Sequence, residues 1–143
     1  MKHLLLALSI SIPSLSFACI DLSGTYTMCQ SDLGSENISE VTINQSTPTM
    51  KITTVQDSES SSVDYILDGI SRTSDYEIDG EKGELSTTAS CDSTQVKVDF
   101  VVDVSQIVIE SGYTIAKDPA GRLLVTEYLD GMELNQTICE SVK

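Results

Sequence analysis

The chain has 143 residues, with 22 acidic and 8 basic side chains, and its formal net charge is −14. Such a charge repels nucleic-acid backbones and anionic lipid surfaces, so we expect no nucleic-acid partner. It favours a basic partner or serves to keep the protein in solution. Beyond the N-terminal region, no apolar run is long enough to span a membrane.

The first eighteen residues have the pattern of a secretory signal peptide. Lys2 provides a positive start, and residues 4–12 form an apolar run too short to span a bilayer. Ser16 and Ala18 are small residues at positions −3 and −1 of a cut. The sequence therefore predicts cleavage of residues 1–18, which leaves one mature domain, residues 19–143, in the periplasm or outside the cell.

Cleavage also removes the only histidine, which excludes most common catalytic sites from the mature chain. The only histidine, His3, lies in the signal peptide, so the mature chain has no Ser-His-Asp or Cys-His site and no histidine-ligated metal. The cysteines lack the Cys-x-x-Cys spacing of redox and zinc sites. We therefore expect a protein that is not an enzyme and that holds neither a metal nor a cofactor.

Four cysteines remain after cleavage: Cys19, Cys29, Cys91 and Cys139. An even number in an exported chain favours two disulfides. The competing interpretation is a lipoprotein that is anchored to the membrane through Cys19 at the new N-terminus. Against it, the bulky Phe17 at position −2 does not fit a lipobox, and lipidation leaves one of the other thiols without a partner.

Apolar and polar residues alternate along the mature chain in short runs separated by turn signals such as Asp68-Gly69, Asp79-Gly80 and Asp130-Gly131. Residues 56–62 (Gln-Asp-Ser-Glu-Ser-Ser-Ser) predict a polar loop between two strands. The pattern predicts about eight to ten strands, near residues 22–30, 37–45, 49–56, 62–68, 70–78, 84–91, 94–103, 105–116, 121–129 and 132–141.

The alternation gives each strand one apolar and one polar face, which predicts an all-β, antiparallel up-and-down meander. A sandwich satisfies the alternation equally well, but the unbroken series of hairpins favours a closed barrel, which has no exposed edge. The predicted inner face includes Tyr26, Ile43, Val98, Ile107, Ile109, Tyr113, Leu134 and Ile138, and the predicted outer face includes Asn135 and Thr137.

Several stretches of the mature chain carry a family resemblance. Residues 22–26 (Leu-Ser-Gly-Thr-Tyr) contain a Gly-x-aromatic motif of the kind that opens a first barrel strand. Residues 65–69 (Tyr-Ile-Leu-Asp-Gly) have the pattern of a hairpin in the middle of a barrel. Residues 107–113, 121–125 and 132–139 have the pattern of closing hairpins. Together these stretches resemble the calycin group, the lipocalins and fatty-acid-binding proteins, and in particular bacterial lipocalin-like domains. The resemblance implies a single lipocalin-like β-barrel.

The chain departs from that group at positions that matter for ligands. Tyr26 stands where lipocalins usually place a tryptophan, and the mature chain has no tryptophan. Residues 134–139 lack the Arg-x-Tyr with which fatty-acid-binding proteins hold a carboxylate, and residues 30–37 leave no room for their helical lid. The resemblance therefore implies a fold, and no ligand is carried over with it.

A ligand cavity inside such a barrel is expected to be lined by Glu127, Gln136, Tyr65 and Tyr113. Alternation places Glu127 on the apolar face between Val125 and Leu129, where a carboxylate needs a partner or water. The alternative is that Glu127 lies at a barrel mouth in contact with solvent, or that a bulge changes the register.

The predicted topology constrains the disulfides. Cys19 and Cys29 bracket the first strand, so an extended chain at about 3.3 Å per residue holds them roughly 30 Å apart, and we do not expect them to bond. Alternation points Cys29 and Cys139 outward on the first and last strands, which are neighbours if the barrel closes. We therefore expect Cys29–Cys139 across that seam and Cys19–Cys91 across one barrel end.

The sequence thus favours a monomeric, exported barrel that binds a hydrophobic or amphipathic small ligand. The alternative is an acidic protein-interaction module or an inhibitor of a basic hydrolase in the cell envelope, because an acidic surface suits a cationic target. Residues 111–113 (Ser-Gly-Tyr) weakly resemble the Ser-Gly loop of lysozyme inhibitors, although here they lie inside a predicted strand.

Overall fold

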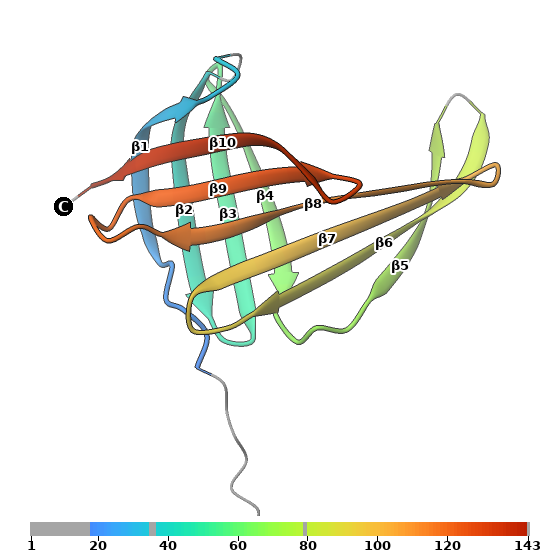
Figure 1. The fold of residues 1–143 in the computed structure, drawn as a ribbon, viewed down its shortest axis with the longest axis horizontal. Helices are drawn as coiled ribbons and strands as arrows, with labels where there is room; N and C mark the ends of the chain where they lie inside the picture. Colours follow the sequence, from blue (N-terminus) through green and yellow to red (C-terminus); the bar gives the residue numbers. More distant parts are fainter. Residues whose placement is uncertain (1–17, 35–36, 79, 143) are drawn as a thin grey trace, which may run out of the picture.

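The computed structural model describes residues 18–34, 37–78 and 80–142, which form ten β-strands and no helix (Figure 1). The expected signal peptide, apart from Ala18, lies outside these residues. Within the described part of the chain, no helix has the length and apolarity needed to cross a membrane. The strands are β1 (Gly24–Ser31), β2 (Ile38–Ser46), β3 (Thr49–Gln56), β4 (Glu59–Ile66), β5 (Arg72–Ile78), β6 (Glu81–Cys91), β7 (Gln95–Val104), β8 (Ile107–Lys117), β9 (Leu123–Leu129) and β10 (Met132–Ser141).

All ten strands form one antiparallel sheet in the order β4-β3-β2-β1-β10-β9-β8-β7-β6-β5. The prediction of an all-β, antiparallel meander is therefore confirmed. The first and last strands are neighbours, with Thr27 of β1 opposite Glu140 of β10. Asp130 and Gly131 make the tight turn between β9 and β10, and both have the positive φ (49° and 76°) that an Asp-Gly hairpin turn requires.

The polar segment 56–62 was predicted to be a loop, and this prediction is wrong. Only Asp57 and Ser58 form a turn, with φ of 49° and 72°, and the serines after them belong to β4. The hydroxyl oxygens of Ser62 and Thr53 on β3 lie 2.8 Å apart. Serine is common in loops, which misled the prediction. Here the serines occupy an edge strand, where most side chains are exposed.

The sheet curls without closing, so the prediction of a closed barrel is wrong. β4 and β5 stand at opposite ends of the strand order, and β5 leads away from β4 in Figure 1. The segment that connects β4 to β5 bonds to β6 instead, since the N–H of Gly69 donates to the carbonyl of Ala89 at 2.9 Å. β5 then pairs with β6 over its whole length, from Arg72 opposite Thr87 to Ile78 opposite Glu81.

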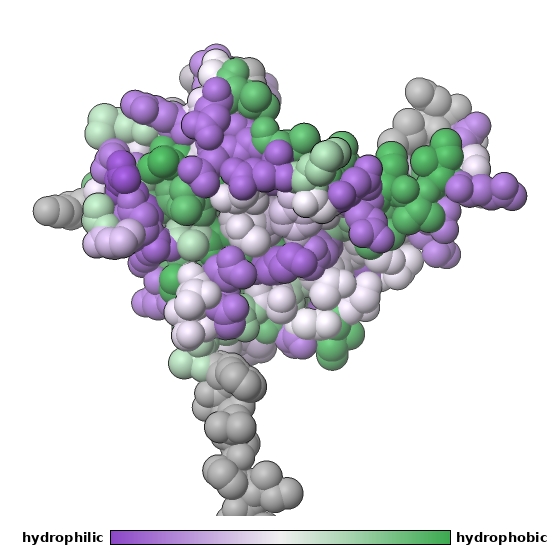
Figure 2. Space-filling model, in the orientation of Figure 1, coloured by the Kyte–Doolittle hydropathy of each residue, from purple (hydrophilic) through white to green (hydrophobic). Residues whose placement is uncertain are grey.

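The hairpins β5–β6 and β7–β8 extend beyond the rest of the sheet as a projecting arm, at the right of Figure 1. We define this projecting arm as residues 72–78, 80–86 and 101–110. The pairing of β8 with β9 begins only at Ser111, so the start of β8 reaches past the end of β9. Ile107 and Ile109 are accordingly 63% and 42% exposed, although both were predicted to lie in the core. Figure 2 shows the resulting hydrophobic surface on the arm.

The core lies within the curled part of the sheet, where the inward side chains of strands on opposite sides approach one another. Each of the largest core side chains is at most 1% exposed, so these positions tolerate little change in side-chain volume. These residues are Leu22, Tyr26, Ile43, Met50, Val96, Val98, Leu123 and Cys139.

A bulge in β10 reverses the predicted faces of that strand. The register shifts between Glu133 and Asn135, and every residue after the shift points to the opposite side. The buried residues of β10 are therefore Asn135, Thr137 and Cys139, and not Leu134, Gln136 and Ile138 as predicted.

A second bulge lies in β1, where Met28 has a φ of 49° and the register shifts between Thr27 and Gln30. Met28 is 68% exposed, whereas Cys29 packs against the core. The prediction that Cys29 and Cys139 point outward is therefore wrong for both. Because both strands are bulged, both cysteines turn inward together. A disulfide joins them across β1 and β10, at a sequence separation of 110.

Candidate functional site

A cavity of about 200 Å³ lies inside the curled part of the sheet. Most of its wall is aliphatic, which suits an apolar molecule or an apolar part of one. Three hydroxyl groups, from Thr54, Tyr113 and Thr137, and one carboxylate, from Glu127, interrupt the apolar wall. The full lining is Ile38, Val41, Ile43, Ile52, Thr54, Val63, Tyr113, Ile115, Leu123, Val125, Glu127, Thr137 and Cys139.

Glu127 lines this cavity from β9 and is only partly buried. Its neighbour across the ladder is Asn135 of β10, whose Nδ2 donates to Glu127 Oε2 at 3.5 Å. Asn135 is itself held by Ser31, whose hydroxyl donates to Asn135 Oδ1 at 2.8 Å. The carboxylate therefore receives one long hydrogen bond from an amide that is fixed at its other end.

Tyr113 and Tyr65 meet at the edge of the cavity. The Tyr113 hydroxyl donates to the Tyr65 hydroxyl at 2.6 Å, and the rings form an edge-to-face pair with centroids 6.3 Å apart. Burial raises the pKa of both hydroxyls, and for Tyr113 the bond to Tyr65 adds to the shift. Both groups therefore stay neutral at physiological pH, and they offer hydrogen bonds without charge.

A second hollow, of about 360 Å³, lies where β4 and β5 separate. Val63 lines both spaces, while Tyr65 lines the second one and Tyr113 the first, so the tyrosine pair stands between them. Arg72 also lines the second hollow, but its guanidinium is exposed and pairs with Asp68 at 2.7 Å.

The structure places Gln136 outside the cavity, in contrast to the prediction from alternation. The bulge in β10 turns this side chain to the outer face, where its Nε2 donates to Thr126 Oγ1 at 3.4 Å. Asn135 and Thr137, the two neighbours of Gln136, face inward in its place. Of the four expected residues, Glu127 and Tyr113 line the cavity and Tyr65 contacts it through Tyr113.

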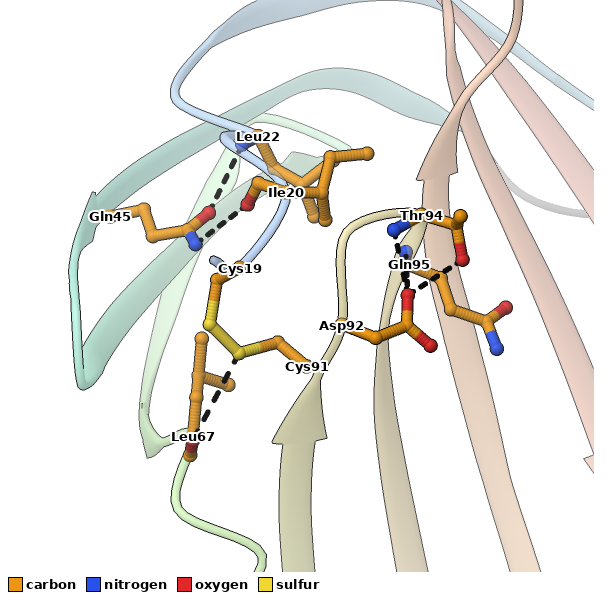
Figure 3. The surroundings of a disulfide bond; sticks show 9 residues. All are labelled: Cys19, Ile20, Leu22, Gln45, Leu67, Cys91, Asp92, Thr94 and Gln95. Carbon is orange, nitrogen blue, oxygen red and sulfur yellow. Dashed lines mark hydrogen bonds between the residues drawn. A yellow bond between two sulfur atoms is a disulfide. The ribbon is translucent and has the colours of Figure 1, made fainter. Parts of the chain in front are cut away.

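The opposite end of the curled sheet is filled by the N-terminal segment. The Tyr26 hydroxyl donates to the carbonyl of Leu22 at 2.7 Å, and both residues are buried. The side-chain amide of Gln45 accepts from the N–H of Leu22 at 3.0 Å and donates to the carbonyl of Ile20 at 2.8 Å (Figure 3). The N-terminal segment therefore blocks this end, which leaves the other end, near the β1–β2 and β3–β4 turns at the top of Figure 1, and the gap between β4 and β5 as the ways into the cavity.

The Cys19–Cys91 disulfide ties this N-terminal segment to the end of β6 (Figure 3). The N–H of Ile20 also donates to the carbonyl of Asp92 at 2.7 Å. Together these bonds hold the N-terminal segment across this end of the curled sheet. The disulfide joins residues that are 72 positions apart in the sequence.

Alternation alone could not have identified Asn135 and Thr137 as inward residues. Both follow the bulge. The residues at the bulge, Glu133 and Leu134, are neither glycine nor proline, so they give no sign of a bulge in the sequence. Within residues 18–34, 37–78 and 80–142 there is no cluster of side chains that could hold a metal ion.

No protein-family model matches the sequence, and no curated protein matches it. Solved structures do match. Human cRBP IV is 17% identical over 85% of this chain and 98% of its own length, with a TM-score of 0.59. The REP1-NXSQ fatty acid transporter is 10% identical over 85% of this chain and 96% of its own, with a TM-score of 0.58. Fatty-acid-binding protein 1 of Echinococcus granulosus is 10% identical, with a TM-score of 0.59, over 85% and 97% of the two chains.

These structures have ten per cent to seventeen per cent of their residues in common with the chain, so they show its fold and nothing more. The fold is calycin-like, in agreement with the resemblance seen in the sequence. The matches cover 85% of this chain and nearly all of each neighbour.

Proposed function

We propose that the protein is an exported carrier that binds a small amphipathic ligand in the cavity beside Glu127. The observation that supports this most is the cavity itself, an apolar space of about 200 Å³ with one carboxylate in its wall. A dry apolar cavity of about 150 Å³ is known to hold benzene. The space is smaller than most ligand pockets, so we propose a compact ligand with an apolar part little larger than one aromatic ring.

The structural neighbours are in keeping with a binding role. Two of them are named as a fatty acid transporter and a fatty-acid-binding protein, and neither name describes an enzyme. The proposal for this chain is likewise binding without catalysis. It does not extend to fatty acids, because the carboxylate of Glu127 and the size of the cavity favour another ligand.

Filling the cavity is expected to abolish binding. Burial of a phenyl group contributes about 1.5–3 kcal/mol, so 2-phenylethanol should bind weakly and saturably, with a Kd of roughly 6–80 mM. Val125→Phe adds a ring to the cavity wall and should remove this binding. Leu124→Phe is the matched control, since its side chain is the next along β9, outside the cavity lining, and it should bind as the original protein does. Calorimetric titration measures both.

Equal binding by the Val125→Phe and Leu124→Phe variants would contradict the cavity as the binding site. A thermal melt of each variant shows whether it is folded. A Val125→Phe protein that melts cooperatively and still binds 2-phenylethanol leaves the proposal without support.

Export and disulfide formation belong to the same proposal. Two disulfides favour an oxidising compartment, and a signal peptide that is cleaved before Cys19 directs the chain to such a compartment. A lipid anchor on Cys19 would need the sulfur that the disulfide to Cys91 uses, so the two modifications exclude each other. We propose the disulfide, and hence a protein that is not lipid-anchored.

The intact mass of the exported protein tests this directly. Without reductant, we expect the mass of residues 19–143 less four hydrogens, and no thiol that iodoacetamide alkylates. A mass raised by a lipid, together with an alkylated Cys91, would establish the lipoprotein instead.

The projecting arm supports a second candidate function, an acidic protein-interaction module. Its apolar residues Ile107 and Val108 are 63% and 55% exposed, and they share the β7–β8 hairpin with the exposed Glu110 and with the exposed Asp103, which lies opposite Val108. Apolar surface next to acidic side chains suits a basic partner. For inhibition of a basic hydrolase, unchanged lysozyme activity with the protein in excess at low salt would contradict it. The Ser111-Gly112-Tyr113 segment lies within β8 and forms no loop.

A further inference from the structure

We infer that the ligand of the cavity is a small organic amine, bound with its ammonium group on the Glu127 carboxylate. This inference rests on the proposed binding function and adds the charge of the ligand to it. It follows from the chemistry of the cavity wall, from the unused bonding capacity of Glu127, and from the dimensions of the space.

Among the described residues that line the cavity, Glu127 carries the only ionisable carboxyl or basic group, and the other polar groups there are hydroxyls. One of these, the Tyr113 hydroxyl, already donates to Tyr65. The wall therefore offers a ligand one full negative charge and no positive charge, in a partly buried setting where charge interactions are stronger than in water.

The carboxylate also has capacity to spare. It can accept about four hydrogen bonds, and the described residues supply one, at 3.5 Å, from Asn135. The ion pairs among the described residues use Arg72, Lys97 and Arg122, and none of them involves Glu127. An ammonium group brings three donors and the missing positive charge, so it fits what this site lacks.

A carboxylate ligand would instead meet a like charge inside the cavity and a protein of net charge −14 around it. A neutral ligand would have to leave the carboxylate without a counter-charge while displacing its water. Of the three charge classes, a cation is therefore the one that the cavity favours.

Three probes with the same phenyl group separate these classes: 2-phenylethylamine, 2-phenylethanol and phenylacetate. We expect calorimetric titration of the disulfide-bonded mature protein at low salt to give at least tenfold tighter binding for the amine than for the alcohol, and the weakest binding for phenylacetate. Glu127→Gln keeps the shape of the side chain and removes its charge. In that variant the preference for the amine over the alcohol should fall to less than threefold.

Glu133→Gln is the matched control, because it removes the same charge from an exposed position on β10. It should retain the full preference for the amine, which separates an effect of the site from an effect of net charge.

Each outcome decides between the two proposals. Equal or tighter binding of the alcohol or phenylacetate to the original protein would overturn the amine while the binding function stands. A preference that survives Glu127→Gln, or that Glu133→Gln also removes, would overturn the role of Glu127. No binding of any probe would overturn both the amine and the cavity as a ligand site.

Discussion

Removing the Cys29–Cys139 disulfide is expected to lower the free energy of unfolding by about 4–5 kcal/mol. In the chain-entropy model a disulfide restricts the unfolded chain more when it closes a longer loop, and this one joins residues 110 positions apart. The substitution also removes packing from the folded state, because Cys139 is fully buried in the core and lines the cavity. A typical domain has only about 5–15 kcal/mol in total, so the change is a large share of it.

Urea denaturation of a Cys29→Ala/Cys139→Ala protein measures this loss against the original protein. The Cys19→Ala/Cys91→Ala protein is the matched control. Its disulfide spans 72 positions, so the same model predicts a loss of about 4 kcal/mol, slightly smaller. A loss below about 1 kcal/mol for Cys29→Ala/Cys139→Ala would contradict the predicted contribution of the link between β1 and β10 to stability.

Substitution of Gly112 by alanine is expected to cost about 2–3 kcal/mol, as overpacking of a well-packed site does. Gly112 lies in β8 under the ring of Tyr128, which reaches across it from β9. A Cβ at this position would lie 2.7 Å from Tyr128 Cζ and closer still to the carbonyl oxygen of Val98. The backbone of β7 cannot move away, since Asp99 pairs with Gly112 in the ladder.

The neighbouring Ser111→Ala substitution is the control for this prediction, since it removes one hydroxyl from β8 and adds nothing. We expect it to change stability by less than about 0.5 kcal/mol. Thermal or urea unfolding gives both values. A Gly112→Ala protein as stable as Ser111→Ala would show that Tyr128 does not lie over this glycine.

The strands could be predicted from the sequence because their signals are local. Alternation over five or more residues marked each run, and pairs such as Asp130-Gly131 marked the turns, since these residues accept positive φ. The segment 56–62 failed for the same reason, because its serines are as common in loops as in an exposed edge strand.

The faces of β10 and of the second half of β1 could not be predicted, because bulges have no reliable local signal, whereas Tyr26, before the bulge in β1, was correctly placed on the inner face. Met28 adopts a positive φ although it is not glycine, and the shift after Glu133 occurs in an ordinary sequence. Each bulge reverses every side chain that follows it in the strand. This is why Glu127, on a strand without a bulge, was placed correctly on the inner face, whereas Gln136 was not.

The gap between β4 and β5 and the projecting arm depend on long-range geometry. Ile107 and Ile109 alternate as core residues do, and only the end of β9 opposite Ser111 leaves them exposed. Where a strand continues past its neighbour is set by the register of the whole sheet, which no short stretch of sequence contains.

The central claim is that the cavity beside Glu127 binds a small amphipathic ligand, and a methyl NMR titration with 2-phenylethanol tests it most directly. We predict saturable shifts of the Ile43, Ile52 and Val125 methyl groups, which line the cavity, and none at Ile107 and Ile109 on the projecting arm. Shifts confined to the arm, or no saturable shift at the cavity methyl groups, would contradict the claim.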